Sequence, residues 1–114
     1  PATQTCLQWH GAEVQREPAG AAVLASSPAC RVQSMMVGDR AFSIQFHLEM
    51  TPDTVAEWAE VPAYKAALDR SLGAGGFERL KSEADRRMKD FNRDARQLYD
   101  NFLGQVRAWK RTTA

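Results

Sequence analysis

The chain has 114 residues, of which 44% are apolar and 25% charged, and its formal net charge is +1. This length and composition suit one globular domain or part of one. A nearly neutral charge argues against a general nucleic-acid binder, and no run approaches the roughly 18 apolar residues of a membrane-spanning helix. The two cysteines, Cys6 and Cys30, form no disulfide framework, and the first residues do not resemble a signal peptide. We therefore expect a cytoplasmic protein with neither nucleic acid nor membrane as a partner.

The first half of the chain has the composition of short strands joined by turns. Residues 5–9 and 21–25 are compact runs of the strand type. Residues 31–37 and 40–46 flank Gly38 and Asp39. Two strand-like runs around a short turn that contains glycine predict a β-hairpin.

The second half is predicted to be helical. Thr51 is a capping residue that precedes Pro52, which favours the first position of a helix. Pro62 predicts the start of another helix, with Tyr64, Ala67 and Leu68 facing inward. The glycine-rich run 73–76 predicts its end.

Residues 77–109 predict one long amphipathic helix, because apolar residues recur at spacings of three or four. These residues are Phe77, Leu80, Ala84, Met88, Phe91, Ala95, Leu98, Phe102, Val106 and Trp109. Residues 77–114 carry ten Lys or Arg against six Asp or Glu, which indicates a mildly basic, solvated helix surface. Such a helix would be about 50 Å long, against roughly 30 Å for a domain of this size. We expect it to bend back, to break near Gly104, or to pack on a partner.

His47 and Glu49 are the candidate catalytic residues. They follow the apolar strand run and stand two positions apart, so in an extended segment both side chains face the same side. A carboxylate that accepts the imidazole N–H fixes the tautomer and stabilises the protonated ring. The pair would therefore serve as a general base if a nucleophile lay within reach. From these two residues alone, a surface His and Glu at a strand end is the other interpretation.

The order of several landmarks resembles the C-terminal half of a class I glutamine amidotransferase domain, over roughly residues 5 to 60. The landmarks are Trp9-His10-Gly11, Leu24-Ala25-Ser26-Ser27, the hairpin, and Gln45-Phe46-His47-Leu48-Glu49. The resemblance implies an α/β fold class, namely part of a flavodoxin-like fold with a partial mixed sheet, followed by C-terminal helices. It divides the chain into an amidotransferase part, residues 1–61, and a helical extension, residues 62–114.

The same resemblance implies a Cys-His-Glu triad, with His47 as general base and Glu49 as its orienting carboxylate. A cysteine would attack the side-chain amide of glutamine, and ammonia would leave for an acceptor that the sequence does not identify. No cofactor and no metal are implied.

Three departures from the family pattern limit what the chain can do alone. Leu48 stands where proline is common, which removes no catalytic atom. Ala12 follows His10-Gly11 where an acidic residue is usual, so we interpret His10 as structural. Neither Cys6 nor Cys30 has the neighbouring glycines of a Gly-x-Cys-x-Gly turn, so the nucleophile is expected on a missing N-terminal segment or a second chain.

The fragment alone is therefore expected to be inactive, whereas the full-length protein would be an enzyme. Because a partial sheet leaves edges unpaired, we also expect a homo-oligomer. A different interpretation is a catalytically silent module that docks a partner through its long helix. A zinc site built from His10, His47, Glu49 and a cysteine fits no recognised spacing.

Overall fold

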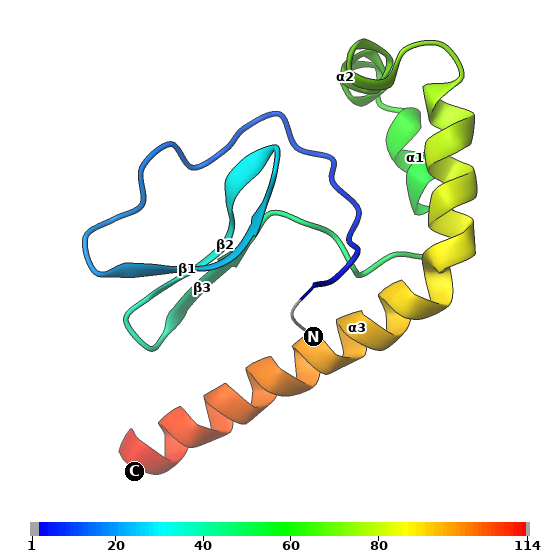
Figure 1. Ribbon diagram of the computed structural model, residues 1–114. Helices are drawn as coiled ribbons and strands as arrows, with labels where there is room; N and C mark the ends of the chain where they lie inside the picture. Colours follow the sequence, from blue (N-terminus) through cyan, green and yellow to red (C-terminus); the bar gives the residue numbers. More distant parts are fainter. Residues whose placement is uncertain (1–2, 114) are drawn as a thin grey trace. The chain divides into compact units, whose positions relative to one another are not determined.

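The computed structural model describes residues 3–113, which divide after His47 into two compact units (Figure 1). The chain belongs to the mixed α/β class, with an antiparallel sheet in the first unit and helices in the second. The boundary expected between residues 61 and 62 was taken from the family resemblance, whereas the two units are defined by their internal packing. That boundary stays a prediction. Within the described residues, no helix combines the length and the apolar character required to cross a bilayer.

The first unit is a three-stranded antiparallel sheet in the order β1-β2-β3. Its strands are β1 (Ala21–Ser27), β2 (Cys30–Val37) and β3 (Ala41–Ile44). The predicted hairpin is confirmed, with Val37 opposite Ala41 and Gly38 at a φ of 63° in the turn. Because Arg40 belongs to this turn, β3 begins one residue later than expected. It also ends at Ile44, although the Gln45 N–H still donates to the Gln33 carbonyl at 2.9 Å.

The first strand begins at Ala21 as expected, but it ends two residues later than the sequence predicts. β1 continues through Ser26 and Ser27 and pairs with β2 down to Ser27 opposite Cys30, with irregular register on either side of Ala25. Both serine hydroxyls serve the neighbouring strand: Ser26 Oγ donates to the Arg31 carbonyl at 2.6 Å, and Ser27 Oγ accepts the Cys30 N–H at 3.2 Å. These bonds stabilise the tight turn between β1 and β2.

The second unit contains three helices: α1 (Thr54–Ala59), α2 (Pro62–Leu72) and α3 (Gly76–Thr113). Each of them contacts the other two. The prediction that Pro52 opens the first helix is wrong. Asp53 is the N-cap, and the Thr54 hydroxyl accepts the Thr51 N–H at 2.9 Å, so Pro52 lies in the turn before the helix.

The start of α2 at Pro62 and its end before Gly73 are confirmed. Leu68 is buried as expected, but the Tyr64 side chain is 51% exposed, so its expected inward position is wrong. Gly73 closes the helix with a φ of 71°, a conformation that glycine adopts without steric strain.

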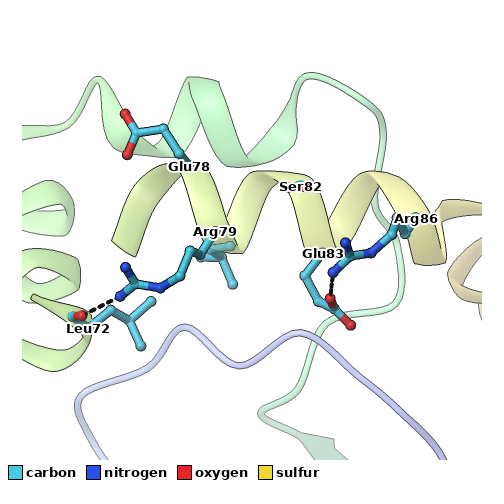
Figure 2. Close-up of a pocket in the computed structure, with 7 residues that line it drawn as sticks. Leu72, Glu78, Arg79, Ser82, Glu83 and Arg86 are labelled. Atoms are coloured by element: carbon cyan, nitrogen blue, oxygen red, sulfur yellow. Dashed lines mark hydrogen bonds and ion pairs between the residues drawn. The ribbon is translucent and has the colours of Figure 1, made fainter. Parts of the chain in front are cut away.

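The junction between α2 and α3 is held by one arginine of α3. Arg79 donates from Nη2 to the Leu72 carbonyl at 2.7 Å and from Nη1 to the Ala74 carbonyl at 2.8 Å. Figure 2 shows this side chain reaching the end of α2, beside a shallow hollow of about 580 Å³ that Ser82, Glu83 and Arg86 also line. The carbonyls at a helix end have no partner within the helix, so the guanidinium satisfies groups that would otherwise need water.

The long helix is longer than predicted and passes through Gly104 without interruption. A single glycine lowers helix stability by only about 1 kcal/mol, which neighbouring turns can offset. The ribbon of α3 instead changes direction farther toward its N-terminus, where its colour passes from yellow to orange (Figure 1). The expected break near Gly104 is therefore not found, and the packing of this helix on a partner stays a prediction.

Candidate functional site

His47 is held at the backbone by the segment that carries Trp9 and His10. Its N–H donates to the Leu7 carbonyl at 2.8 Å, and its carbonyl accepts the Leu7 N–H at 3.0 Å. Residues 5–9 therefore supply one bridge rather than the expected strand. Leu7 is 4% exposed and anchors this bridge, whereas the imidazole of His47 is half-buried. The position of the His47 backbone is thus fixed while its ring keeps contact with solvent.

Glu49 lies on the first residues of the second unit, between two buried side chains. Leu48 and Met50 are each 2% exposed, and the Glu49 side chain is exposed. The Met50 N–H donates to the Leu48 carbonyl at 2.8 Å, which forms a three-residue turn around Glu49. The Glu49 carboxylate accepts the Leu48 N–H through Oε2 at 3.0 Å. The chain is therefore not simply extended here, and buried neighbours on both sides hold the glutamate in place.

Gln45 connects the end of the sheet to the loop that follows His10. Its side-chain N–H donates to the Ala12 carbonyl at 3.2 Å, and its amide oxygen lies 4.0 Å from the Cys30 thiol. Together with the backbone bond to Gln33, these contacts fix Gln45, which lies two positions before His47. Gln45 thus holds the backbone that leads to His47. The sequence alone gave it no role beyond membership of the motif.

His10 belongs to a polar cluster in the first unit. Its Nδ1 lies 2.7 Å from the Ala12 carbonyl oxygen, so this nitrogen carries a proton. Its Nε2 lies 3.2 Å from Gln8 Oε1 and 3.3 Å from Gln33 Oε1. A neutral ring protonated at Nδ1 accepts at Nε2, which requires one of the two amides to present its NH₂ group instead. These contacts fit a structural role for His10, which links its own loop to Gln33 of β2.

The cluster borders a surface hollow of about 550 Å³ within the first unit. It is lined by Gln8, His10, Gly11, Ala12, Glu13, Gln15, Ser27, Ala29, Cys30 and Gln33. Sequence reasoning missed this hollow. The available signal was Gln33, a long amide in the middle of a strand, which is buried and donates to Ser27 Oγ at 3.0 Å.

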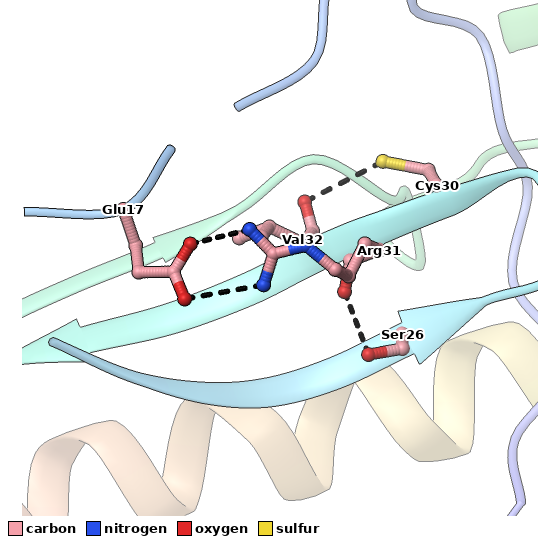
Figure 3. A network of polar contacts seen from close by, with 5 residues as sticks. All are labelled: Glu17, Ser26, Cys30, Arg31 and Val32. Atoms are coloured by element: carbon pink, nitrogen blue, oxygen red, sulfur yellow. Dashed lines mark hydrogen bonds and ion pairs between the residues drawn. The ribbon is translucent and has the colours of Figure 1, made fainter. Parts of the chain in front are cut away.

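The two cysteines differ from a catalytic nucleophile in their backbone and surroundings. A nucleophile elbow holds its residue in a strained conformation, but every described residue with positive φ is a glycine. Cys30 is 5% exposed and its thiol donates to the Val32 carbonyl at 3.5 Å (Figure 3). Cys6 is half-buried, 3.9 Å from the Gln4 side-chain oxygen. Cys30 is therefore a packed thiol, and Cys6 is a half-buried thiol in a loop.

In the first unit, the shifted pKa values belong to an exposed ion pair between Glu17 and Arg31 of β2. The Arg31 guanidinium binds the Glu17 carboxylate through both of its terminal nitrogens, as Figure 3 shows. The hydrogen bonds from Arg31 are the main reason that the pKa of Glu17 falls to about 2. The pair joins the segment before β1 to β2, and neither of its residues lines the hollow beside His10. Within residues 3–113, no three His, Cys, Asp or Glu side chains gather closely enough to hold a metal ion.

A scan against models of known protein families, a search of curated proteins and a search of solved structures each found no match to this chain.

Proposed function

We propose that residues 5–60 are the His- and Glu-bearing part of a class I glutamine amidotransferase domain of flavodoxin-like fold. The observation that carries the proposal is the bridge between Leu7 and His47. It brings the segment with Trp9-His10-Gly11 alongside the run Gln45-Phe46-His47-Leu48-Glu49, and these are the two landmarks on which the resemblance depends most. The bridge, the Gln45 contacts and the buried Leu48 together give His47 and Glu49 a defined backbone.

In the proposed reaction His47 accepts the thiol proton of a cysteine that lies outside these 114 residues. The thiolate attacks the carbonyl carbon of the glutamine side-chain amide, and backbone N–H groups bind the negative oxygen that forms. The carbon–nitrogen bond then breaks, His47 returns the proton to the leaving ammonia, and water hydrolyses the thioester. Glu49 orients the imidazole and stabilises its protonated form.

The proposal includes a cytoplasmic location and a full-length protein whose ammonia passes to an acceptor bound elsewhere. Residues 1–114 alone would not hydrolyse glutamine, since Cys6 and Cys30 lack the backbone of a nucleophile. The alternative, a silent module that docks a partner, is favoured by one observation: Leu98 and Phe102 on α3 are 37% and 50% exposed.

The test compares His47→Ala and Glu49→Gln with wild type in the full-length protein, with ammonia release from glutamine as the measurement. His47→Ala removes the general base and is expected to lower turnover at least 100-fold. Glu49→Gln removes the orienting carboxylate and should lower turnover less. Glu60→Gln, at an exposed helix end, is the matched control and should retain activity. Retained turnover in a folded His47→Ala variant would remove this histidine from the mechanism.

The upstream sequence gives an independent test. A Gly-x-Cys-x-Gly turn between a strand and a helix favours the enzyme, whereas another residue at the cysteine position favours the silent module.

A further inference from the structure

Gln33 stands in the middle of β2 and belongs to none of the landmarks on which the family resemblance depends. It is 4% exposed, although its side chain ends in an amide with one donor end and one acceptor end. A buried amide needs a partner at each end, because an unsatisfied one loses the hydrogen bonds that it would form with water. The partners of Gln33 therefore indicate what this residue holds in place.

The contacts of Gln33 reach each of the landmark segments in the first unit. Its Nε2 donates to Ser27 Oγ at 3.0 Å, and its Oε1 lies 3.3 Å from His10 Nε2. Its backbone carbonyl accepts the Gln45 N–H at 2.9 Å. Because a hydroxyl both donates and accepts, Ser27 suits either orientation of the amide, so the end that faces His10 can match either protonation state of the imidazole. One buried residue thus joins the segments that carry Ser27, His10 and Gln45.

These contacts return to Gln33 through the Ala12 carbonyl. His10 Nδ1 lies 2.7 Å from this oxygen, and the Gln45 side-chain N–H donates to the same oxygen at 3.2 Å. The path from the Gln33 amide therefore passes through the imidazole and this carbonyl to Gln45, whose backbone N–H bonds to Gln33 again. We refer to Gln33, His10, Ala12 and Gln45 as the closed network. Hydrogen bonds connected in this way stabilise one another, so the loss of one link weakens the rest.

We propose that Gln33 is a positioning residue for proton transfer at His47, an inference that rests on the proposed function. Gln45 of the closed network lies two positions before His47 in the chain. The segment that carries His10 also carries Leu7, which pairs with the His47 backbone. Both backbone connections of the base therefore lead to the closed network. Proton transfer requires a closely placed base, and a displacement of about 1 Å can lower a rate about 100-fold.

The first test is steady-state kinetics of the full-length protein carrying Gln33→Met. Methionine keeps the length of the side chain and removes both ends of the amide. In the proposed reaction His47 transfers protons and does not hold the substrate, so kcat should fall about tenfold while KM changes less than about threefold. Circular dichroism establishes that the variant is folded.

Gln15→Met is the matched control for this measurement. Gln15 lines the same hollow as Gln33, but its amide donates to Glu13 in its own segment at 2.9 Å. This variant should keep both kinetic constants. A raised KM at unchanged kcat in Gln33→Met would assign Gln33 to substrate binding, and unchanged values of both in the folded variant would leave it a structural role alone. Either result overturns the proposal.

A double-mutant cycle tests the route through His10. His10→Asn keeps a donor for the Ala12 carbonyl and removes the nitrogen that faces Gln33. Because His10→Asn and Gln33→Met open the same link, the double variant should lose no more activity than the more impaired single variant. If the two losses multiply, the residues act independently and the proposed route is wrong. Should Gln33→Met fail to fold, His10→Asn opens the link from the other side and provides the same kinetic test.

Hydrogen exchange of the 114-residue chain separates this inference from the proposed function. Gln33→Met should speed exchange of the Leu7, Gln45 and His47 amides about tenfold, whereas amides paired between β1 and β2 keep their wild-type rates. Equal acceleration across the sheet would show a general loss of stability and overturn the positioning role. If the acceleration is selective but the wild-type full-length protein releases no ammonia, the proposed function fails and the role in proton transfer fails with it.

Discussion

Leu7 and His47 exchange both of their backbone hydrogen bonds, although 40 positions separate them in the sequence, with N···O distances of 3.0 and 2.8 Å. Among the described residues, this bridge is the backbone contact that joins the segment around Leu7 to the candidate general base. Its stability depends on the Leu7 side chain, which is 4% exposed. Apolar packing of Leu7 thus supports the backbone position of His47.

Leu7→Ala should destabilise the chain by about 2–4 kcal/mol, because truncation of a buried leucine loses apolar burial and leaves a cavity. Urea unfolding followed by circular dichroism measures the loss. Leu24→Ala in β1 is the matched control, since the Leu24 side chain is 53% exposed and should change stability by less than about 0.5 kcal/mol. Equal losses in the two variants would show that Leu7 does not anchor the bridge.

Two glycines of α3 should respond to alanine in opposite directions. At Gly76 an added Cβ would meet the Leu72 Cβ at 2.5 Å, whereas at Gly104 nothing lies within 4 Å. Gly76→Ala should therefore cost about 1–3 kcal/mol through steric overlap. Gly104→Ala should stabilise the helix by up to about 1 kcal/mol, because alanine restricts the unfolded chain and favours helix. Thermal unfolding of the two variants checks the signs, and a stabilised Gly76→Ala variant would contradict the close approach of α2 and α3.

Arg79→Lys should weaken the junction of α2 and α3 despite conserving charge. The arginine reaches the Leu72 and Ala74 carbonyls with two different nitrogens, and a lysine ammonium lacks this planar fork. We expect a loss of about 1 kcal/mol in unfolding free energy and faster amide exchange at residues 73–76. Arg96→Lys is the control, because Arg96 forms an exposed pair with Asp100 that lysine can also form. If both variants exchange alike, Arg79 has no special part in the junction.

Features encoded by local chemistry were predictable from the sequence. The turn at Gly38, the helix start at Pro62 and the helix end at Gly73 each depend on the conformational preferences of one or two residues. The amphipathic spacing of α3 likewise depends only on its own positions.

Features that depend on distant partners were not predictable in the same way. The segment around Leu7 has strand composition, yet its pairing is limited to one bridge because its partner is His47. Tyr64 fits a helical apolar face, but the neighbours of α2 determine which face is buried, and this side chain lies outside it. The turn at Glu49 arises from a backbone bond between Leu48 and Met50, which no spacing rule indicates. Each correction is therefore tertiary in origin.

Glu17→Gln should remove a pH dependence of stability in acid. Two hydrogen bonds from Arg31 lower the pKa of Glu17 to about 2, below its ordinary value of 4.5. Because the folded pKa is the lower one, the contribution is fully present above about pH 4.5 and disappears as the pH falls through about 2. The pair is at the surface, so salt should screen it and the effect should be small. Urea midpoints measured from pH 6 to pH 2 should therefore fall less steeply for Glu17→Gln than for wild type.

Glu13→Gln, an exposed glutamate in the same segment, is the control and should follow the wild-type curve. Identical curves for all three proteins would mean that the Glu17–Arg31 pair adds nothing to the stability of the folded chain.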